Sequence, residues 1–425
     1  MDDIKDASGH LKRSLVLVMA IATGLAVANN YYAQPLLPLI GRNLQLTSGV
    51  AALVVTVAQI GYALGLLFLL PLGDLVERRR LIVLLSVGTG VALLCLGASP
   101  NEGFLFPAAL AVGSFSVLAQ VLVPFSASLA APDERGRVVG LVMSGLLVGI
   151  LLARTVSGLL AQTGSWRIVY FAAGAAMFVQ AGLLHRILPE WREETDLSYP
   201  QLLRSVFTLI KEEPVLRRRS LFGFFSFGTF SVLWTSMAFV LSRHYHEGPG
   251  VIGLFGLAGA AGAVTATMAG RMSDSGRSRA ATGISTALLV ASWLALWAGG
   301  TTIALLVVGI VVLDIGAQGL HITNQGEIYR LHPEARSRLT AAYMVIYFIG
   351  GGVGSAVSGL VYAHVGWGGV CVVGEIFAAL SFLLWLLTLA HPPVSPAPPR
   401  LRPSPGGITL VGPGSGDDPE SSLGS

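Results

Sequence analysis

The chain has 425 residues, of which 53% are hydrophobic and only 12% charged, and its formal net charge is +4. So little polar surface cannot cover a water-soluble globule of this length, which excludes a soluble enzyme or binding domain and predicts a bilayer protein. The basic residues lie in short clusters between apolar runs, which is not the pattern of a nucleic-acid-binding face.

Twelve apolar runs are long enough to cross the ~30 Å hydrocarbon core. The first six cover residues 14–40, 50–72, 81–99, 104–130, 138–162 and 167–188, and the second six cover 219–242, 250–272, 280–299, 302–328, 339–363 and 367–390. Because lipid offers the backbone no hydrogen-bond partner, and the runs lack strand alternation, we expect every run to be an α-helix.

The first run has an alternative interpretation. Lys12 and Arg13, the apolar stretch after them and the small residues Ala26 to Ala28 together imitate a secretory signal peptide. The apolar character resumes after this point, and cleavage would leave an odd number of spans. We therefore interpret residues 14–40 as the first transmembrane helix.

A 35-residue stretch beginning at Pro132 is repeated 201 residues later, beginning at Pro333. The two copies align without a gap and share ten identities, among them the Val-Ser-Gly-Leu run at 156–159 and at 357–360. A self-match about half the chain away indicates two structurally similar halves. The predicted fold is an all-α integral membrane protein with twelve transmembrane helices in two pseudo-symmetric six-helix bundles.

The distribution of Lys and Arg predicts the orientation. With twelve spans, 23 of the 27 basic residues fall on one side, three fall on the other, and Arg154 lies inside a span. The positive-inside rule then places both termini on the cytoplasmic side of the cell (inner) membrane. The predicted domains are an N-terminal bundle (1–188), a cytoplasmic linker with an amphipathic helix (189–218), a C-terminal bundle (219–390) and a disordered cytoplasmic tail (391–425).

The loop after the second run, within GYALGLLFLLPLGDLVERRR, places Asp74 just before Arg78 and Arg79. A degenerate second copy, GRMSDSGRSR, supplies Gly270, Asp274 and Arg277 at the matching place in the other half. The pair resembles the G-x-x-x-D-R-x-G-R-R motif of the major facilitator superfamily. The resemblance implies a cytoplasmic gate in which the aspartate and arginines hold neighbouring helix ends. The alternative is that the arginines only determine topology.

The fifth run carries small residues at every fourth position, which allow two helices to approach closely. These residues are Gly145, Gly149, Ala153 and Ser157. The spacing resembles the antiporter signature of the same superfamily, G-x-x-x-G-P-x-x-G-G, although Ile150 stands in place of the proline and Arg154 in place of the last glycine. This resemblance implies proton-driven export.

Arg154 is a charge within an apolar run. An unpaired charge there costs ~2.5–3.5 kcal/mol even on the lenient insertion scale, so the guanidinium must face a cavity, a carboxylate or carbonyls. Two interpretations remain open, a structural ion pair between the halves and a role in substrate binding or coupling.

The tenth run is the most polar of the buried spans. Asp314, Gln318, His321 and Gln325 lie within about 60° of one another on a helix. Burial at mid-depth favours the protonated form of a carboxyl, and histidine titrates near neutral pH in water, so Asp314 and His321 could take up and release a proton. Alternatively, His321 and Gln325 are structural polar residues near the cytoplasmic end.

The first run contains NNYYAQPLLP, which resembles bacterial drug and arabinose efflux permeases of this superfamily. The resemblance implies a central cavity lined by helices one, four, seven and ten. Candidate cavity residues are Thr23, Asn30, Tyr31, Gln34, Gln120, Trp234, Gln318 and Gln325. Of these, Gln120 and Trp234 are the weaker candidates, because packing explains each of them better than substrate contact.

These features predict a monomeric secondary transporter that works by alternating access and exports a small drug-like molecule in exchange for protons. A sugar efflux permease or a facilitated-diffusion carrier is the alternative. A membrane enzyme is a second alternative, disfavoured because the chain has no HExxH, GxSxG or P-loop pattern. Cys95 and Cys371 lie apart in apolar runs, so we expect no metal site, and no cofactor is implied.

Overall fold

A computed structural model describes residues 10–192, 198–331 and 336–390. Every regular element in these ranges is a helix. Residues up to Leu386 form one compact unit, and the described residues after it, at the end of the last helix, belong to a second. The predicted tail 391–425 lies outside the described residues.

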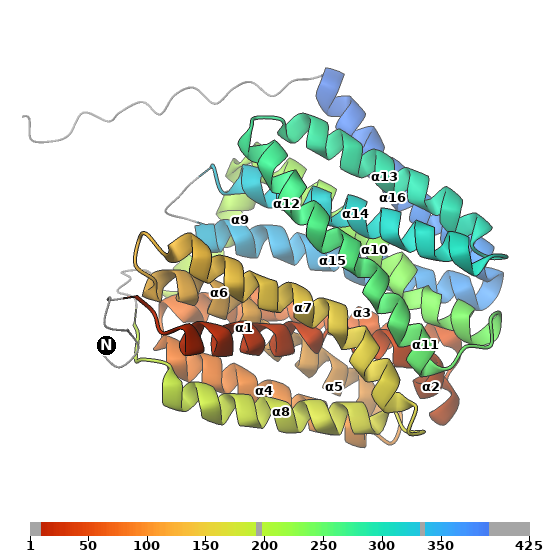
Figure 1. The fold of residues 1–425 in the computed structure, drawn as a ribbon, viewed down its shortest axis with the longest axis horizontal. Coiled ribbons are helices and arrows are strands. Elements are labelled where there is room, and N and C mark those ends of the chain that lie inside the picture. The colour runs from red at the N-terminus through yellow and green to blue at the C-terminus, as the bar shows by residue number, and fades with distance from the viewer. Residues whose placement is uncertain (1–9, 193–197, 332–335, 391–425) are drawn as a thin grey trace, which may run out of the picture. The chain divides into compact units, whose positions relative to one another are not determined.

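The helices of the first half follow the predicted spans (Figure 1). They are α1 (Arg13–Ala28), α2 (Ala33–Asn43), α3 (Ser48–Phe68) followed by the short 3₁₀ turn η2 (Leu70–Asp74), α4 (Arg78–Ala98), α5 (Glu102–Phe115), α6 (Leu118–Leu129), α7 (Arg135–Ala161) and α8 (Arg167–Ile187). The first span is therefore built from α1 and α2, and the fourth from α5 and α6.

The second half begins after the linker. Its helices are α9 (Tyr199–Glu212) in the linker, α10 (Pro214–Arg243), α11 (Pro249–Leu254), the 3₁₀ segment η3 (Phe255–Gly259), α12 (Ala260–Asp274), α13 (Ser278–Ala298), α14 (Ile303–Ile328), α15 (Arg336–Val365) and α16 (Trp367–Ala390). Within the described ranges, eleven helical segments are long and apolar enough to cross a membrane, and Pro249–Gly259 is a shorter apolar helix. The all-α membrane fold is confirmed.

The predicted span at 250–272 is not one continuous α-helix. It divides into α11, η3 and α12, and glycine occupies every third position at 250, 253, 256, 259 and 262. A 3₁₀ helix has three residues per turn, so this spacing keeps Gly256 and Gly259 on one face of η3. A Cβ on Gly253 would lie 2.4 Å from the carbonyl oxygen of Arg154, and one on Gly256 would lie 2.9 Å from the Arg154 Cβ. Only glycine permits this approach to α7.

The break between α1 and α2 also has a local cause. Pro35 lies in the first turn of α2, and proline has no N–H with which to continue the ladder of α1. The turn between the helices contains Asn30 and Tyr31, which are buried inside the protein. A broken helix in a membrane is tolerated where its backbone is enclosed by protein, so this turn belongs to the interior.

Helix α7 packs closely against α1 through the small-residue face. A Cβ on Gly145 would lie 2.1 Å from the carbonyl oxygen of Ala20, and one on Gly149 would lie 2.2 Å from that of Gly24. By contrast, a Cβ on Gly140, in the same helix, would meet nothing within 4 Å.

This difference gives a matched pair of substitutions. Gly145→Ala should destabilise the folded protein by about 1–3 kcal/mol, because the backbone of α1 has to move. Gly140→Ala should be neutral or stabilise by up to about 1 kcal/mol, since alanine is the better helix former. Thermal unfolding of both purified variants in one detergent checks the expectation, and equal midpoints would contradict the close packing of α1 on α7.

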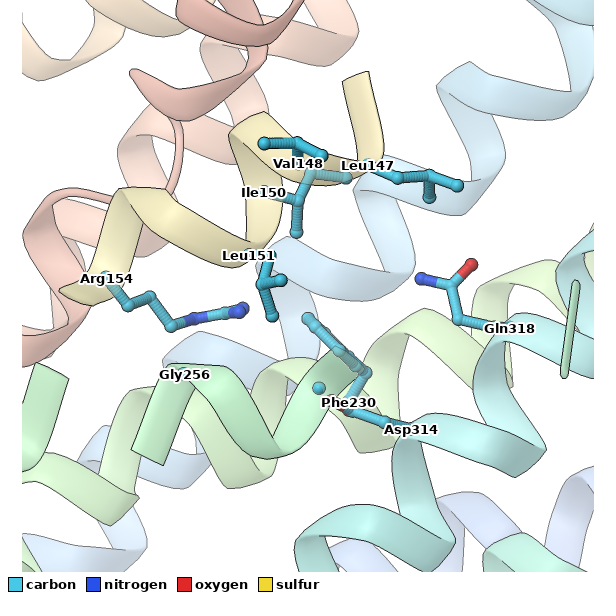
Figure 2. Close-up of a pocket in the computed structure, with 10 residues that line it drawn as sticks. Leu147, Val148, Ile150, Leu151, Arg154, Phe230, Gly256, Asp314 and Gln318 are labelled. Atoms are coloured by element: carbon cyan, nitrogen blue, oxygen red, sulfur yellow. The ribbon is translucent and has the colours of Figure 1, made fainter. Parts of the chain in front are cut away.

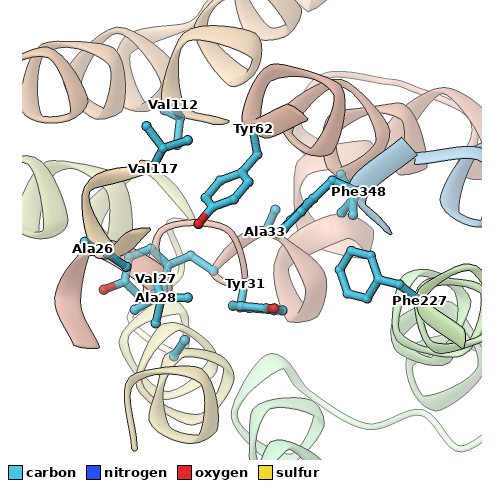
Figure 3. Packing of buried hydrophobic residues seen from close by; sticks show 14 of the residues in the cluster. Ala26, Val27, Ala28, Tyr31, Ala33, Tyr62, Val112, Val117, Phe227 and Phe348 are labelled. Atoms are coloured by element: carbon cyan, nitrogen blue, oxygen red, sulfur yellow. The ribbon is translucent and has the colours of Figure 1, made fainter. Parts of the chain in front are cut away.

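The seam between α3 and α15 is closed along its length. Gly49 faces the Gly359 backbone near one end, and Tyr62 stacks on Phe348 with 4.1 Å between ring centres near the middle. Figure 3 shows Tyr62 and Phe348 side by side, with Phe227 of α10 beyond them. The two halves of the chain therefore meet without a gap on this side.

The linker helix α9 adds to this closure. The linker is predicted to hold an amphipathic helix, and in α9 Leu202 and Val206 are buried and the helix packs on α10, α15 and η2. Leu202 and Val206 line a small pocket together with Leu70, Pro71 and Ala341. The Ser198 N–H is bonded to the Gln201 side chain, which fixes the start of the helix.

Candidate functional site

Arg154 lies in α7 and is only 2% exposed. Its Nε donates a hydrogen bond to Gln34 Oε1 at 2.5 Å. The guanidinium lies 3.6 Å from the ring centre of Trp234 and 4.9 Å from that of Tyr31. Aromatic faces carry a negative quadrupole, so these rings stabilise the charge.

Asp314, in α14, contacts the same tryptophan at the edge of its ring. Its Oδ1 accepts a hydrogen bond from Trp234 Nε1 at 3.3 Å, and the side chain is buried. No ion pair within 4.0 Å joins Arg154 to a carboxylate of the described residues. Trp234 thus links the two charges, with its ring face on the cation and its N–H on the anion.

A cavity of about 100 Å³ adjoins this cluster (Figure 2). It is lined by Leu147, Val148, Ile150, Leu151, Arg154, Phe230, Gly256, Gly259, Asp314 and Gln318. Arg154 Nη2 is buried and has no hydrogen-bond partner among the described residues. A buried donor without a partner is costly, so this nitrogen is suited to a group that enters the cavity.

The glycines of the broken eighth span form part of the cavity wall. A Cβ on Gly259 would lie 2.6 Å from Asp314 Oδ2, and one on Gly262 would lie 2.8 Å from Gln318 Cγ. These glycines and Phe230 were not among the predicted site residues. The glycine at every third position was the available signal, because this period is that of a 3₁₀ helix and not of a membrane-spanning α-helix.

The structure brings together six of the predicted residues. They are Tyr31, Gln34, Arg154, Trp234, Asp314 and Gln318. Gln34 and Arg154 come from the first half, and Trp234 and Asp314 from the second. The site therefore lies where the two halves meet. The cavity is lined by the fifth, seventh, eighth and tenth spans, whereas the resemblance implied the first, fourth, seventh and tenth.

The other candidates lie elsewhere. Thr23 donates to the carbonyl of Met19, and Gln120 bonds to Tyr62. Asn30 is buried with no hydrogen-bond partner for its amide among the described residues. Gln325 is half-buried in α14 and does not line the cavity.

The predicted proton pair of Asp314 and His321 is not in direct contact. His321 Nδ1 is bonded to Tyr343 Oη at 3.0 Å, and its ring packs on Tyr347 at 4.8 Å between ring centres. Asp314 is bonded to Trp234 instead. The two titratable groups therefore belong to different clusters of the same helix.

At the predicted cytoplasmic end, the first gate motif contacts several elements. Arg79 forms an ion pair with Glu190 and donates to the carbonyl of Leu188, at the end of α8. Arg78 donates to Ser128 Oγ of α6 at 3.4 Å. Asp74 lines a small pocket with Leu202 and Val206 of α9 and Arg338 of α15. Asp74 thus lies between the first half, the linker and the second half.

The second gate motif differs from the first. Gly270 is half-buried in α12, and Arg277 is exposed at the start of α13. The side chain of Asp274 lies outside the described residues. Here Ser278 of α13 donates to Glu327 of α14, which also pairs with Arg219 of α10 at 3.4 Å.

Asp74→Asn tests the gate. Loss of a partly exposed carboxylate charge near Arg338 should cost the closed arrangement up to about 1 kcal/mol, which shifts its population by about fivefold. In a variant whose only cysteine replaces Leu151, the rate of labelling by a water-soluble thiol reagent from the cytoplasmic side should rise by that factor. Arg80→Gln, at an exposed neighbouring position, is the control. Equal rates for Asp74→Asn and the parent would contradict the gate.

An all-helical membrane fold with a buried, charged site between two halves defines a polytopic transport protein. A model of the Major Facilitator Superfamily matches residues 19–323 and 219–413, so the chain belongs to this superfamily. It is 52% identical over 377 residues to the putative uncharacterized transporter YgaY of Escherichia coli, covering 88% of this chain and 96% of that protein. It is 35% identical over 392 residues to a probable transporter of Streptomyces coelicolor, covering 91% of this chain and 90% of that one.

Solved structures share the fold. A bacterial homolog of the human lysosomal transporter Spinster, in an inward-facing and unoccupied conformation, has a TM-score of 0.71 and 14% identity, covering 90% of this chain and 98% of that one. The nucleoside transporter NupG has a TM-score of 0.68 and 14% identity, covering 88% of this chain and 99% of that one. At these identities the likeness concerns the fold alone.

Proposed function

We propose that this chain exports a small organic molecule from the cytoplasm in exchange for protons. The halves 1–188 and 219–390 rock about the Arg154 site, in a monomer of the inner membrane with cytoplasmic termini. The observation that carries the proposal is the Arg154–Trp234–Asp314 cluster, because both halves supply its charges and Arg154, which lines the cavity, has a buried donor without a partner among the described residues.

The chemistry of exchange follows from two groups. Arg154 Nη2 donates to an acceptor on the substrate, and ionised Asp314 accepts from a donor on it. When Asp314 takes a proton from the outer solution, its oxygen becomes a weaker acceptor and the substrate leaves. When the site turns inward, the proton is released and substrate binds again. Competition between substrate and proton for one carboxylate is sufficient for antiport.

Everted membrane vesicles that carry this protein test the proposal. Their interior is acidified, and drug-like compounds, sugars and amino acids are added one at a time to the medium, which faces the cytoplasmic side of the protein. At least one compound should accumulate inside and raise the internal pH, and both effects should disappear when the gradient is collapsed. Accumulation of sugars alone, with no change in internal pH, would favour the sugar permease instead.

A further inference from the structure

The cavity beside Arg154 has its mouth on the side of α7. Val148 lines the cavity and is 50% exposed, although it lies near the middle of its helix. It follows Arg135 by 13 residues, which at ~1.5 Å per residue is ~20 Å along the helix, so Val148 lies about midway through a ~30 Å hydrocarbon core.

The surface around this mouth is the lipid-facing side of α7. Exposed residues along the helix are spaced by seven, four, four and three positions, which places them on one face. These residues are Leu141, Val148, Leu152, Val156 and Leu159. At the far end of this stripe α7 packs tightly on α11 through Gly158 and Gly253, so Val156 and Leu159 are exposed to lipid and not to an internal space. Val148 belongs to the same stripe.

The opening is one-sided. Toward the predicted cytoplasmic end, a Cβ on Gly136 or Gly140 of α7 would meet nothing within 4 Å, and α12 packs on α13 and α14. The opposite seam is closed at the same level by Tyr62 against Phe348, and further toward that end by the α9 contacts. The cavity is therefore open at Val148 of α7, whereas the contact of Gly158 with Gly253 closes the predicted outer end of α7 and the seam between α3 and α15 is closed.

We infer that the substrate is an amphiphile that reaches the site sideways, from the cytoplasmic leaflet of the bilayer, through this mouth. The inference rests on the proposed function and adds the chemical class of the substrate. The mouth and the near wall are aliphatic, formed by Leu147, Val148, Ile150 and Leu151, and suit an apolar body. Arg154, Asp314 and Gln318 supply the polar part of the cavity wall.

The head group follows from these polar atoms. Arg154 Nη2 offers a donor without a partner, and Asp314 offers carboxylate oxygens across the Trp234 ring. The two charges compensate each other, so a neutral group that both accepts and donates hydrogen bonds, such as a primary amide or a hydroxyl, suits the site best. The expected substrate is a neutral molecule with such a head and an apolar body.

Primary amides of increasing chain length test this inference in acidified everted vesicles. Butanamide and decanamide are added to the medium, and the internal pH is followed, with the response of Asp314→Asn vesicles subtracted as background. The concentration for half-maximal response should be at least about tenfold lower for decanamide, because its longer chain buries more apolar surface.

A plug at the mouth distinguishes lateral access from access through water. Val148→Trp should raise the half-maximal concentration of decanamide about tenfold, because the indole narrows the mouth. Val156→Trp, on the same stripe beyond the mouth, should change it by less than about twofold. Tryptophan is compatible with lipid at both positions. If Val148→Trp fails to fold, Val148→Phe is measured against Val156→Phe.

Equal effects of the two tryptophan substitutions, or equal potency of the two amides, would overturn the inference. The proposed function would still stand if the response depended on Asp314. No Asp314-dependent response to either amide would also overturn it, and the compound panel in everted vesicles then decides the proposed function separately.

Discussion

Vesicles carrying Asp314→Asn are expected to lose all proton-driven accumulation of substrate while they continue to exchange substrate for substrate. Asparagine keeps the shape of the side chain, and its amide oxygen can still accept the bond from Trp234 Nε1, which spans 3.3 Å to Asp314 in the native protein. It cannot bind or release a proton in the physiological range, so the cycle has no exchangeable proton. Uphill transport should fall to the level of empty vesicles.

Two measurements on the same vesicles separate the outcomes. Uphill accumulation is measured with an imposed pH gradient, and exchange is measured with labelled substrate outside and unlabelled substrate inside. The control is Glu375→Gln, because Glu375 is another carboxyl within a predicted span, in α16, and does not line the cavity. It should retain both activities. Uphill accumulation by Asp314→Asn would exclude Asp314 as the coupling group.

Some site residues could be predicted because a charge in an apolar run has to be explained by its surroundings. Arg154 and Asp314 stood out for this reason, and both are buried beside one cavity. Trp234 was only a weak candidate for the cavity, since an aromatic side chain in an apolar helix has the composition of ordinary packing. That it links the two charges depends on the placement of α10 between α7 and α14, which no local pattern encodes.

His321 shows the limit of a helical-face argument. It shares a face with Asp314, but the two residues are seven positions apart, or ~10 Å at ~1.5 Å per residue, which is too far for direct contact. Each side chain then bonds to what the neighbouring helix presents at its own level, Tyr343 for His321 and Trp234 for Asp314.

Thr23 shows a second limit. A hydroxyl in a membrane helix can bond to the backbone one turn earlier, and Thr23 Oγ1 donates to Met19 O at 2.7 Å. The side chain is then satisfied locally and is not directed to a ligand.

The spans were predictable because hydrophobic length alone decides them. The break in the eighth span was not predictable, because its continuity depends on how closely its glycines approach Arg154 and Asp314.

Substitution of Arg154, the other charge of the site, should lower the stability of the folded protein before any effect on transport can be measured. Arg154→Met leaves Asp314 buried with the Trp234 N–H but without its compensating cation, and a buried charge left uncompensated costs up to about 3–5 kcal/mol. The folded yield in detergent should fall steeply. Arg42→Met, at an exposed arginine outside the membrane core, is the control and should change the yield little.

The double variant Arg154→Met/Asp314→Asn should recover much of this loss of folded yield, because replacing both buried charges by neutral groups of similar size is close to neutral for stability.

The double variant also separates two roles of Arg154. If the arginine only compensates Asp314, the double variant should exchange substrate as well as Asp314→Asn does. If Arg154 Nη2 donates to the substrate, as its lack of a partner among the described residues indicates, the double variant should fold and still lose exchange. The loss should be about ten- to hundredfold, for a charged hydrogen bond worth about 1.5–3 kcal/mol. A folded double variant with undiminished exchange would reduce Arg154 to a structural charge and leave Asp314 alone as the functional group.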